Sequence, residues 1–112
     1  MKLPRGDSAI VDHEKLTGYC LNPQHPRGKH KARVFEAALG LTAENVDELC
    51  AALVAAAATQ EAQPVASDRF GDRYLIDFEI KGPTGAGIVR SLWIVRRGDS
   101  APRLASCYVK QR

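Results

Sequence analysis

The sequence predicts an α+β fold in which three N-terminal helices pack on a four-stranded antiparallel β-meander. Apolar residues recur at helical spacing up to about residue 60. Beyond residue 64 the period changes to two, most clearly in Tyr74–Ile80, as in a half-buried strand. Short turns separate the later segments, and strands joined this way pair with their neighbours. We therefore expect the helices to cover one face of the sheet.

The first helix is expected over His13–Cys20. Asp12 precedes it as an N-cap, because its carboxylate can accept from the free backbone N–H groups of the first turn. Leu16 and Tyr19 lie three apart and would form the apolar side of this helix. Ala9–Val11, just upstream, is expected to be a short strand or packing segment.

Two longer helices are expected next. The second runs from about Arg27 to Leu39, and Gly40 ends it, since glycine readily adopts the left-handed C-cap conformation. Thr42 is expected to cap the third helix, which ends near Gln60. The inner face of the third helix is expected to hold Val46, Leu49, Leu53, Val54 and Ala57.

The four strands are expected over Pro64–Phe70, Tyr74–Ile80, Ile88–Arg97 and Arg103–Lys110. Gly82-Pro83-Thr84-Gly85 separates the middle two, and this composition is typical of a turn. Apolar residues occupy both alternating sets of the third strand, which predicts a central strand partly covered on both sides.

Length and composition predict a single cytoplasmic domain over residues 1–112. A chain of 112 residues with 45% hydrophobic and 26% charged residues suits one globular core. No segment approaches the roughly 20 apolar residues of a membrane span. The N-terminal residues lack an apolar stretch, so no signal peptide is expected.

The cysteines and histidines predict no metal site and no cofactor. Cys20, Cys50 and Cys107 are widely spaced and odd in number, which argues against a disulfide framework and a CxxC-type site. Each cysteine is expected to be a small buried hydrophobe, with a catalytic thiol as the alternative. The three histidines lack companion ligands, and no Walker loop or dinucleotide glycine fingerprint is present.

Charge is distributed in blocks. Residues 1–34 hold seven Lys or Arg against three acids, residues 35–63 hold five acids and no Lys or Arg, and residues 64–112 hold nine basic residues against five acids. A net charge of +3 thus hides two basic blocks on either side of an acidic helix. Clustered positive charge suits a polyanion such as RNA, although solvated surface is the alternative.

The densest basic segment, His25–Arg33, leads into the second helix. Lys31 lies one turn before Phe35 and would share its inward side, where a cation can meet a phosphate. Alternatively, the lysine extends from the edge of the apolar face to water. His25 precedes a proline on a constrained loop and is either an acid or base near neutral pH or a surface hydrogen-bonding group. His30 is expected on the more exposed side.

Two strands supply further candidates. Arg90 interrupts the apolar third strand and needs an anion, either Asp77 or Glu79 on the neighbouring strand or a bound phosphate. On the last strand, Ser106 and Tyr108 share a face, with Arg103 at the start of the strand. These side chains could donate to phosphate oxygens, or the tyrosine could stack on a base. Alternatively, Tyr108 closes the core with a solvated hydroxyl.

Four segments carry a family resemblance: Tyr19–Phe35 with the following Leu39-Gly40, Phe78–Pro83, Val89–Ile94 and Pro102–Tyr108. Together they resemble an uncharacterised family of small bacterial domains found alone or at the C-terminal ends of polymorphic toxins. The layout of helices followed by a meander is similar to the barnase–EndoU–colicin–RelE group of ribonucleases. The resemblance implies a metal-independent, toxin-type endoribonuclease with RNA as substrate and a small neutralising protein, an antitoxin or immunity protein, as partner.

The implied reaction is attack of a ribose 2′-hydroxyl on the adjacent phosphate, which needs a base, an acid and cations. In the family that this chain resembles, threonine often stands at the positions of Ser91 and Ser106. Both residue types carry a hydroxyl, so the group is retained. The implied catalytic residues are His25, Lys31, Arg90 and Ser106. The implied substrate-binding residues are Arg103, Tyr108, Ser91 and His30.

Two other functions remain as alternatives. One is a non-catalytic immunity or adaptor module whose basic face binds an acidic protein. The other is an RNA-binding domain without catalysis. A nuclease would lose activity on single changes at His25 or Lys31 while keeping its fold, whereas a partner-binding module would tolerate them.

Overall fold

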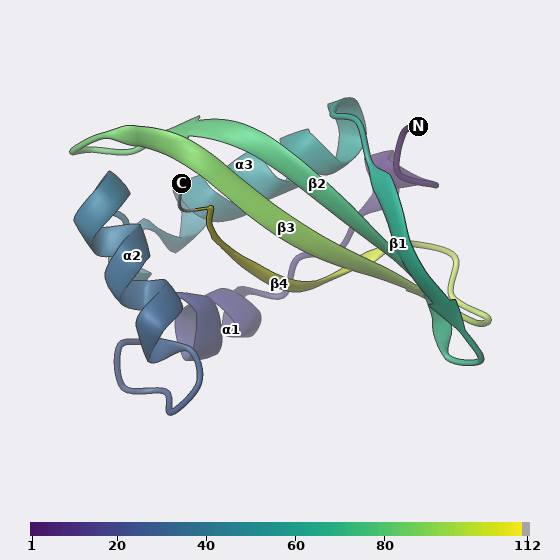
Figure 1. The fold of residues 1–112 in the computed structure, drawn as a ribbon, viewed down its shortest axis with the longest axis horizontal. Helices are drawn as coiled ribbons and strands as arrows, with labels where there is room; N and C mark the ends of the chain where they lie inside the picture. Colours follow the sequence, from purple (N-terminus) through teal and green to yellow (C-terminus); the bar gives the residue numbers. More distant parts are fainter. Residues whose placement is uncertain (111–112) are drawn as a thin grey trace.

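Four antiparallel strands in the order β1-β2-β3-β4 form one sheet, with the last helix behind it and the earlier helices beside its last strand (Figure 1). The structure, a computed structural model, describes residues 1–110. The strands are β1 (Gln63–Asp68), β2 (Gly71–Lys81), β3 (Ala86–Arg96) and β4 (Arg103–Val109). The predicted α+β class and the predicted meander are both confirmed.

The long β2–β3 hairpin forms the centre of the sheet. Its register runs without interruption from Gly71 opposite Arg96 to Lys81 opposite Ala86, so both strands extend beyond most of their predicted limits. The first strand ends earlier than expected, at Asp68 rather than Phe70. Asp68 Oδ1 accepts hydrogen bonds from the backbone N–H groups of Phe70 and Gly71, and this side chain closes the turn into β2.

The first predicted helix forms in the expected place but widens. It consists of α1 (His13–Lys15) followed by the π-helix η2 (Leu16–Cys20), with Leu21 N–H donating to Leu16 C=O. The predicted N-cap is wrong in detail, because the Asp12 side chain makes no capping hydrogen bond. Its carboxylate instead lies 3.7 Å from Arg103 Nη1.

Helix α2 (Lys29–Leu39) begins two residues later than the predicted start at Arg27. The delay has a clear cause, since the His25 side chain holds the N–H groups of Arg27 and Gly28 in a turn. Gly40 ends the helix with φ of 72°, in the predicted left-handed conformation.

Helix α3 (Val46–Thr59) follows a 3₁₀ turn, η3 (Ala43–Asn45), that Thr42 caps as predicted. The Thr42 and Asn45 side chains cap each other's backbone N–H groups in a capping box. Of the expected inner face, Val54 is exposed. Within residues 1–110, no helix combines the length and apolarity needed to cross a bilayer.

The core lies between α3 and the face of the sheet that carries Ile76, Val89 and Trp93, all fully buried. The predicted packing segment Ala9–Val11 contributes only a bridge, in which Ile10 pairs with Arg103 in parallel. No helix covers the opposite sheet face in Figure 1, and Asp77 and Arg90 stand opposite one another there. At the free edge of the sheet, α2 and η2 pack against β4.

Candidate functional site

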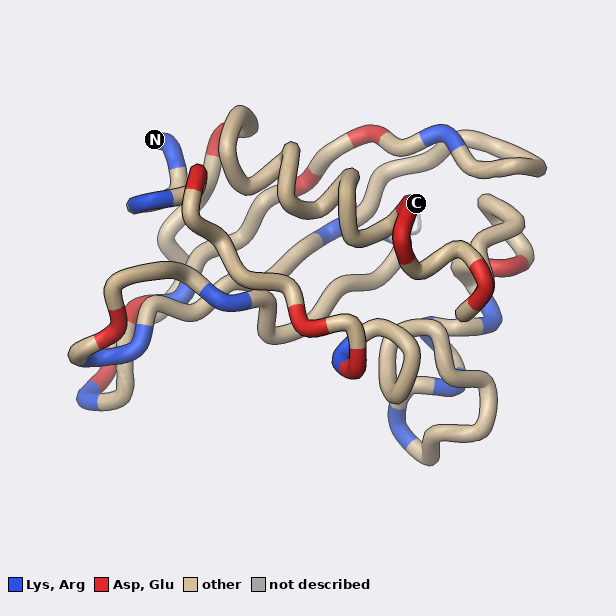
Figure 2. The backbone as a smooth tube through the Cα atoms, turned by 180° about the vertical axis from the view of Figure 1, so that it is seen from behind, with Lys and Arg blue, Asp and Glu red and all other residues tan. Residues whose placement is uncertain are grey.

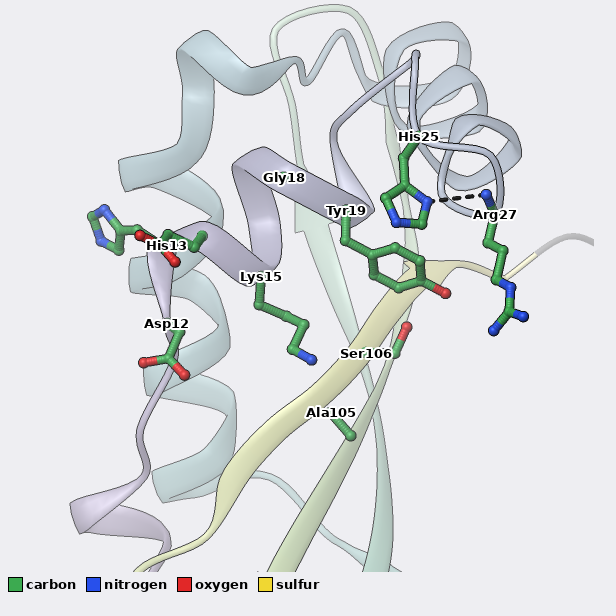
Figure 3. A pocket seen from close by; sticks show the side chains of 10 residues that line it. Asp12, His13, Lys15, Gly18, Tyr19, His25, Arg27, Ala105 and Ser106 are labelled. Carbon is green, nitrogen blue, oxygen red and sulfur yellow. Dashed lines mark hydrogen bonds between the residues drawn. The ribbon is translucent and has the colours of Figure 1, made fainter.

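A cavity of ≈ 980 Å³ opens where the first helical segment meets the edge of the sheet (Figure 3). Its walls come from three segments that are far apart in the sequence: residues 12–19, the loop residues His25 and Arg27, and Ala105-Ser106 of β4. Such a concave region with convergent polar groups is the default place to look for a binding site.

Tyr19 forms the centre of one wall. The Lys31 ammonium donates a hydrogen bond to the Tyr19 hydroxyl oxygen over 3.0 Å and lies 5.0 Å from the centre of its ring. Because that oxygen accepts from Lys31, the phenolic O–H remains available to donate to a ligand. The half-buried Lys31 therefore links α2 to η2 and holds a cation beside the cavity.

His25 packs edge-on against Tyr19, with 4.9 Å between the ring centres. Its Nδ1 accepts from the backbone N–H groups of Arg27 and Gly28, at 3.0 Å and 2.9 Å, one of which Figure 3 draws as a dashed line. Since Nδ1 is committed as an acceptor, the neutral ring carries its proton on Nε2. In this arrangement the Nε2–H of His25 can donate to a ligand, and the Nδ1 lone pair is already used by two backbone N–H groups.

Tyr108, on the last strand, lies between the cations of Lys31 and Arg90. Its ring centre is 5.9 Å from Lys31 Nζ. Tyr108 stands opposite Arg90 in the β3–β4 register, and its proximity contributes, after Asp77, to raising the pKa of Arg90. The pair of Lys31 and Arg90 therefore flanks an aromatic ring that remains half-exposed at the edge of the sheet.

Arg90 is paired with Asp77 rather than with Glu79. Its Nε and Nη2 donate to the two carboxylate oxygens of Asp77, each over 2.9 Å. These hydrogen bonds lower the pKa of Asp77, and the charge of Lys110, 3.6 Å away, lowers it further. Of the two explanations for Arg90 that the sequence left open, the cross-strand ion pair is therefore present.

The remaining predicted residues are placed as follows. Ser106 lines the cavity, and its buried hydroxyl makes no hydrogen bond of ordinary geometry with residues 1–110. Arg103 lies at the Asp12 end of the cavity, 3.7 Å from that carboxylate. His30 is exposed and lines a smaller hollow together with Lys31 and Tyr108.

Ser91 does not reach the site. It is 0% exposed, its hydroxyl donates to the Ile76 carbonyl over 2.8 Å, and it accepts from Trp93 Nε1 over 2.9 Å. The expected contact with substrate is therefore incompatible with this position. The hydroxyl satisfies the buried indole N–H instead.

Free positive charge gathers around the cavity. Lys15, Arg27 and Lys31 form no ion pair with any carboxylate of residues 1–110. Figure 2 shows Lys and Arg along the loops and strands but none along α3, which separates the basic segments as the sequence predicted. The residues described contain no group of three or more His, Cys, Asp or Glu side chains placed to hold a metal ion.

The sequence reasoning missed Tyr19, Lys15 and Arg27 as site residues. Tyr19 was assigned only to the apolar side of its helix. One signal could have found it, since a tyrosine packed on a helix still needs a partner for its hydroxyl. The lysine that supplies this partner comes twelve residues later, so local pattern alone does not pair them.

A family model described as "Domain of unknown function (DUF6883)" matches residues 2–111. This match agrees with the resemblance to an uncharacterised family. No curated protein and no solved structure matches the chain.

Proposed function

We propose that this chain, which belongs to the DUF6883 family, is an endoribonuclease that cleaves RNA by attack of a 2′-hydroxyl on the adjacent phosphate. One observation carries the proposal. Tyr19 and His25 line the cavity as a phenol and an imidazole N–H, and Lys31, from a third segment, places a cation against Tyr19 behind that wall. All three are donors, and the developing charge on a phosphate in transesterification needs donors.

The cations beside the cavity support phosphate binding. Lys15 and Arg27 line it, and Lys31 stands behind Tyr19, without a carboxylate of residues 1–110 paired to any of them. A phosphodiester placed here would receive hydrogen bonds from Tyr19 and His25 and the charge of Lys31. These side chains could supply the electrostatic stabilisation without a metal ion.

The proton of the 2′-hydroxyl needs an acceptor, and the geometry changes the role expected for His25. Because His25 Nδ1 already accepts two backbone hydrogen bonds, His25 serves as donor to the phosphate or to the leaving oxygen. Among the other residues lining the cavity, Glu14 can accept a proton, whereas the His13 ring turns away from Tyr19 (Figure 3) toward Asp47, 3.9 Å away. We assign the base to Glu14.

Tyr108, Arg90 and Arg103 would extend the site along the sheet. Tyr108 offers an aromatic face beside Lys31, which suits stacking on an unpaired base. Arg90 is neutralised by Asp77, so it stands beside Tyr108 in the sheet rather than holding a phosphate. Arg103 remains a candidate phosphate contact at the Asp12 end.

The test is incubation of purified protein with bacterial RNA in EDTA, with 5′-hydroxyl and 2′,3′-cyclic phosphate ends measured. The intact chain should produce such ends, and Lys31→Ala and His25→Ala should abolish them. Arg33→Ala is the matched control, because it removes an exposed cation from the same helix. If none of the proteins cleaves the RNA, or if all of them cleave it equally, the proposal is wrong. Binding without cleavage would point to an RNA-binding domain.

A second candidate function, binding of a protein partner, rests on a different surface. Strand β1 is exposed along its whole length at the edge of the sheet; Val65 within it is 47% exposed, and Phe70 just after it is 60% exposed. Open edge strands readily pair with another chain. For an endoribonuclease of toxin type, the natural partner is a small neutralising protein. Changes at Val65 and Phe70 that abolish partner binding but leave RNA cleavage intact would separate the two functions.

A further inference from the structure

The fold brings two of the three cysteines together behind the cavity. Cys20 is the last residue of η2, Cys107 lies in β4, and both are 0% exposed. They meet where η2 packs against β4, in one buried cluster, and the Cys107 thiol and backbone N–H lie close enough to the Cys20 sulfur to shift its pKa. Strand β4 is the last in the sheet, so N–H groups on its outer side have no strand partner.

The surroundings of the pair differ for its two members. The hydrogen bond from Cys107, with help from Ser106 and Lys31, lowers the pKa of Cys20 to about 7 against the opposing effect of burial. The pKa of Cys107 is raised by its hydrogen bond to Cys20 and by burial. Near neutral pH a large fraction of Cys20 is therefore thiolate beside the Cys107 thiol, which is the state from which disulfides form.

We propose that Cys20 and Cys107 form an oxidisable dithiol that hydrogen peroxide converts to an intramolecular disulfide joining η2 to β4. The inference does not depend on RNA cleavage. A purely structural role, two small hydrophobes in a core, leaves unexplained why both thiols meet each other beside a lysine and a buried serine hydroxyl.

The chemistry balances as two steps. The Cys20 thiolate sulfur attacks one peroxide oxygen and breaks the O–O bond, giving a Cys20 sulfenic acid and a hydroxide that leaves as water. The Cys107 sulfur then attacks the Cys20 sulfur, forming the S–S bond and displacing the second hydroxide, which leaves as water with the Cys107 proton. The two thiols lose two electrons and two protons, and peroxide is reduced to two waters.

Both cysteines are sequence neighbours of residues that line the cavity. Tyr19 and Ser106, which line the cavity, each directly precede one of the two cysteines. A disulfide would therefore tie together the two walls that present Tyr19 and Ser106. It would also remove the Cys20 thiolate that faces the Ser106 hydroxyl and Lys31.

The experiment treats the full chain with hydrogen peroxide, unfolds it, alkylates the free thiols and measures intact mass and cross-linked peptides. We expect the loss of two hydrogen atoms, a Cys20–Cys107 peptide pair and alkylation of Cys50 alone. Cys50 is an internal reference, because it lies half-buried on α3 with its pKa raised by burial and by Asp47. Alkylation of all three cysteines, or a disulfide that contains Cys50, would overturn the proposal.

Two variants sharpen the result. Cys50→Ser should form the same disulfide, and Cys107→Ser should stop at a Cys20 sulfenic acid that dimedone labels. The measurement on the unsubstituted chain needs no variant, so a substitution that disturbs folding cannot hide the answer. Dimedone labelling of Cys50 in place of Cys20 would also count against the pair.

Discussion

The ammonium of Lys31 is fixed 3.0 Å from the hydroxyl oxygen of Tyr19, joining α2 to η2 across the open edge of β4. The contact leaves the lysine without a carboxylate partner among residues 1–110 and leaves the phenol one proton to donate. The cation of Lys31 and the O–H donor of Tyr19 hold each other in position. Removing either one should therefore reduce the contribution of the other to RNA cleavage.

Replacement of Tyr19 by phenylalanine tests this dependence. Tyr19→Phe keeps the ring against His25 and removes only the hydroxyl, so we expect kcat/KM on RNA to fall about 10- to 100-fold, the usual effect of losing a charge-assisted hydrogen bond of about 1.5–3 kcal/mol. Combined with Lys31→Met, the loss should be smaller than the product of the single losses. Independent, multiplying losses would show that the two side chains act separately.

Two substitutions separate the role of His25 in holding the loop from its role in RNA cleavage. His25→Asn retains a side-chain acceptor for the Arg27 and Gly28 N–H groups, so we expect an unchanged melting temperature and lost RNA cleavage. His25→Ala should lose cleavage and also about 1 kcal/mol of stability, as when a helix cap is removed. Thermal unfolding and RNA cleavage are measured on the same preparations. Full activity in His25→Asn would mean that the ring contributes only to the loop.

Much of the fold followed from local pattern. The change from helical to strand period near residue 64, the Gly40 C-cap and the Thr42 N-cap all depend on neighbours in sequence, and all three were predicted. The sequence pattern did not predict hydrogen bonds in which a side chain binds the backbone of nearby residues. The Asp68 carboxylate ends β1 early, and the His25 ring delays α2.

The candidate site was less predictable because its contacts are long-range. Lys31 and His25 were singled out from their types and positions, but the residue that joins them, Tyr19, was expected only in the core. Ser106 was expected as a catalytic residue and Ser91 as a substrate-binding residue. In β3, Ser91 shares the core face with Trp93 and bonds its indole, whereas Ser106 lies next to a register shift in β4 and lines the cavity.

The Asp77–Arg90 pair makes a pH-dependent contribution to stability. Because Arg90 lowers the pKa of Asp77, this contribution is complete above the unfolded-state pKa of about 3.9 and is lost as the pH falls through the lower folded-state value. We expect Asp77→Asn to lower the free energy of unfolding by roughly 1 kcal/mol at pH 7. The difference from the intact chain should shrink below about pH 4.

Glu79→Gln is the matched control for this pair, because Glu79 lies on the same strand and forms no ion pair with residues 1–110. It should leave stability nearly unchanged at pH 7. Urea unfolding at several pH values measures both variants. A deficit in Asp77→Asn that stays constant down to pH 2 would show that the charge of Asp77 is not the cause.

Ser91 separates a role in stability from a role in the site. Its hydroxyl is the partner of the Trp93 indole N–H, 2.9 Å away in a fully buried position. Ser91→Ala strands that donor, so we expect a loss of about 1–3 kcal/mol in the free energy of unfolding, with an unchanged m-value. Ser8→Ala, at an exposed position, should cost almost nothing. At a temperature where Ser91→Ala remains folded, its RNA cleavage should match that of the intact chain. A folded Ser91→Ala protein with normal stability and lost cleavage would instead place the hydroxyl in contact with substrate, against the burial that the structure shows.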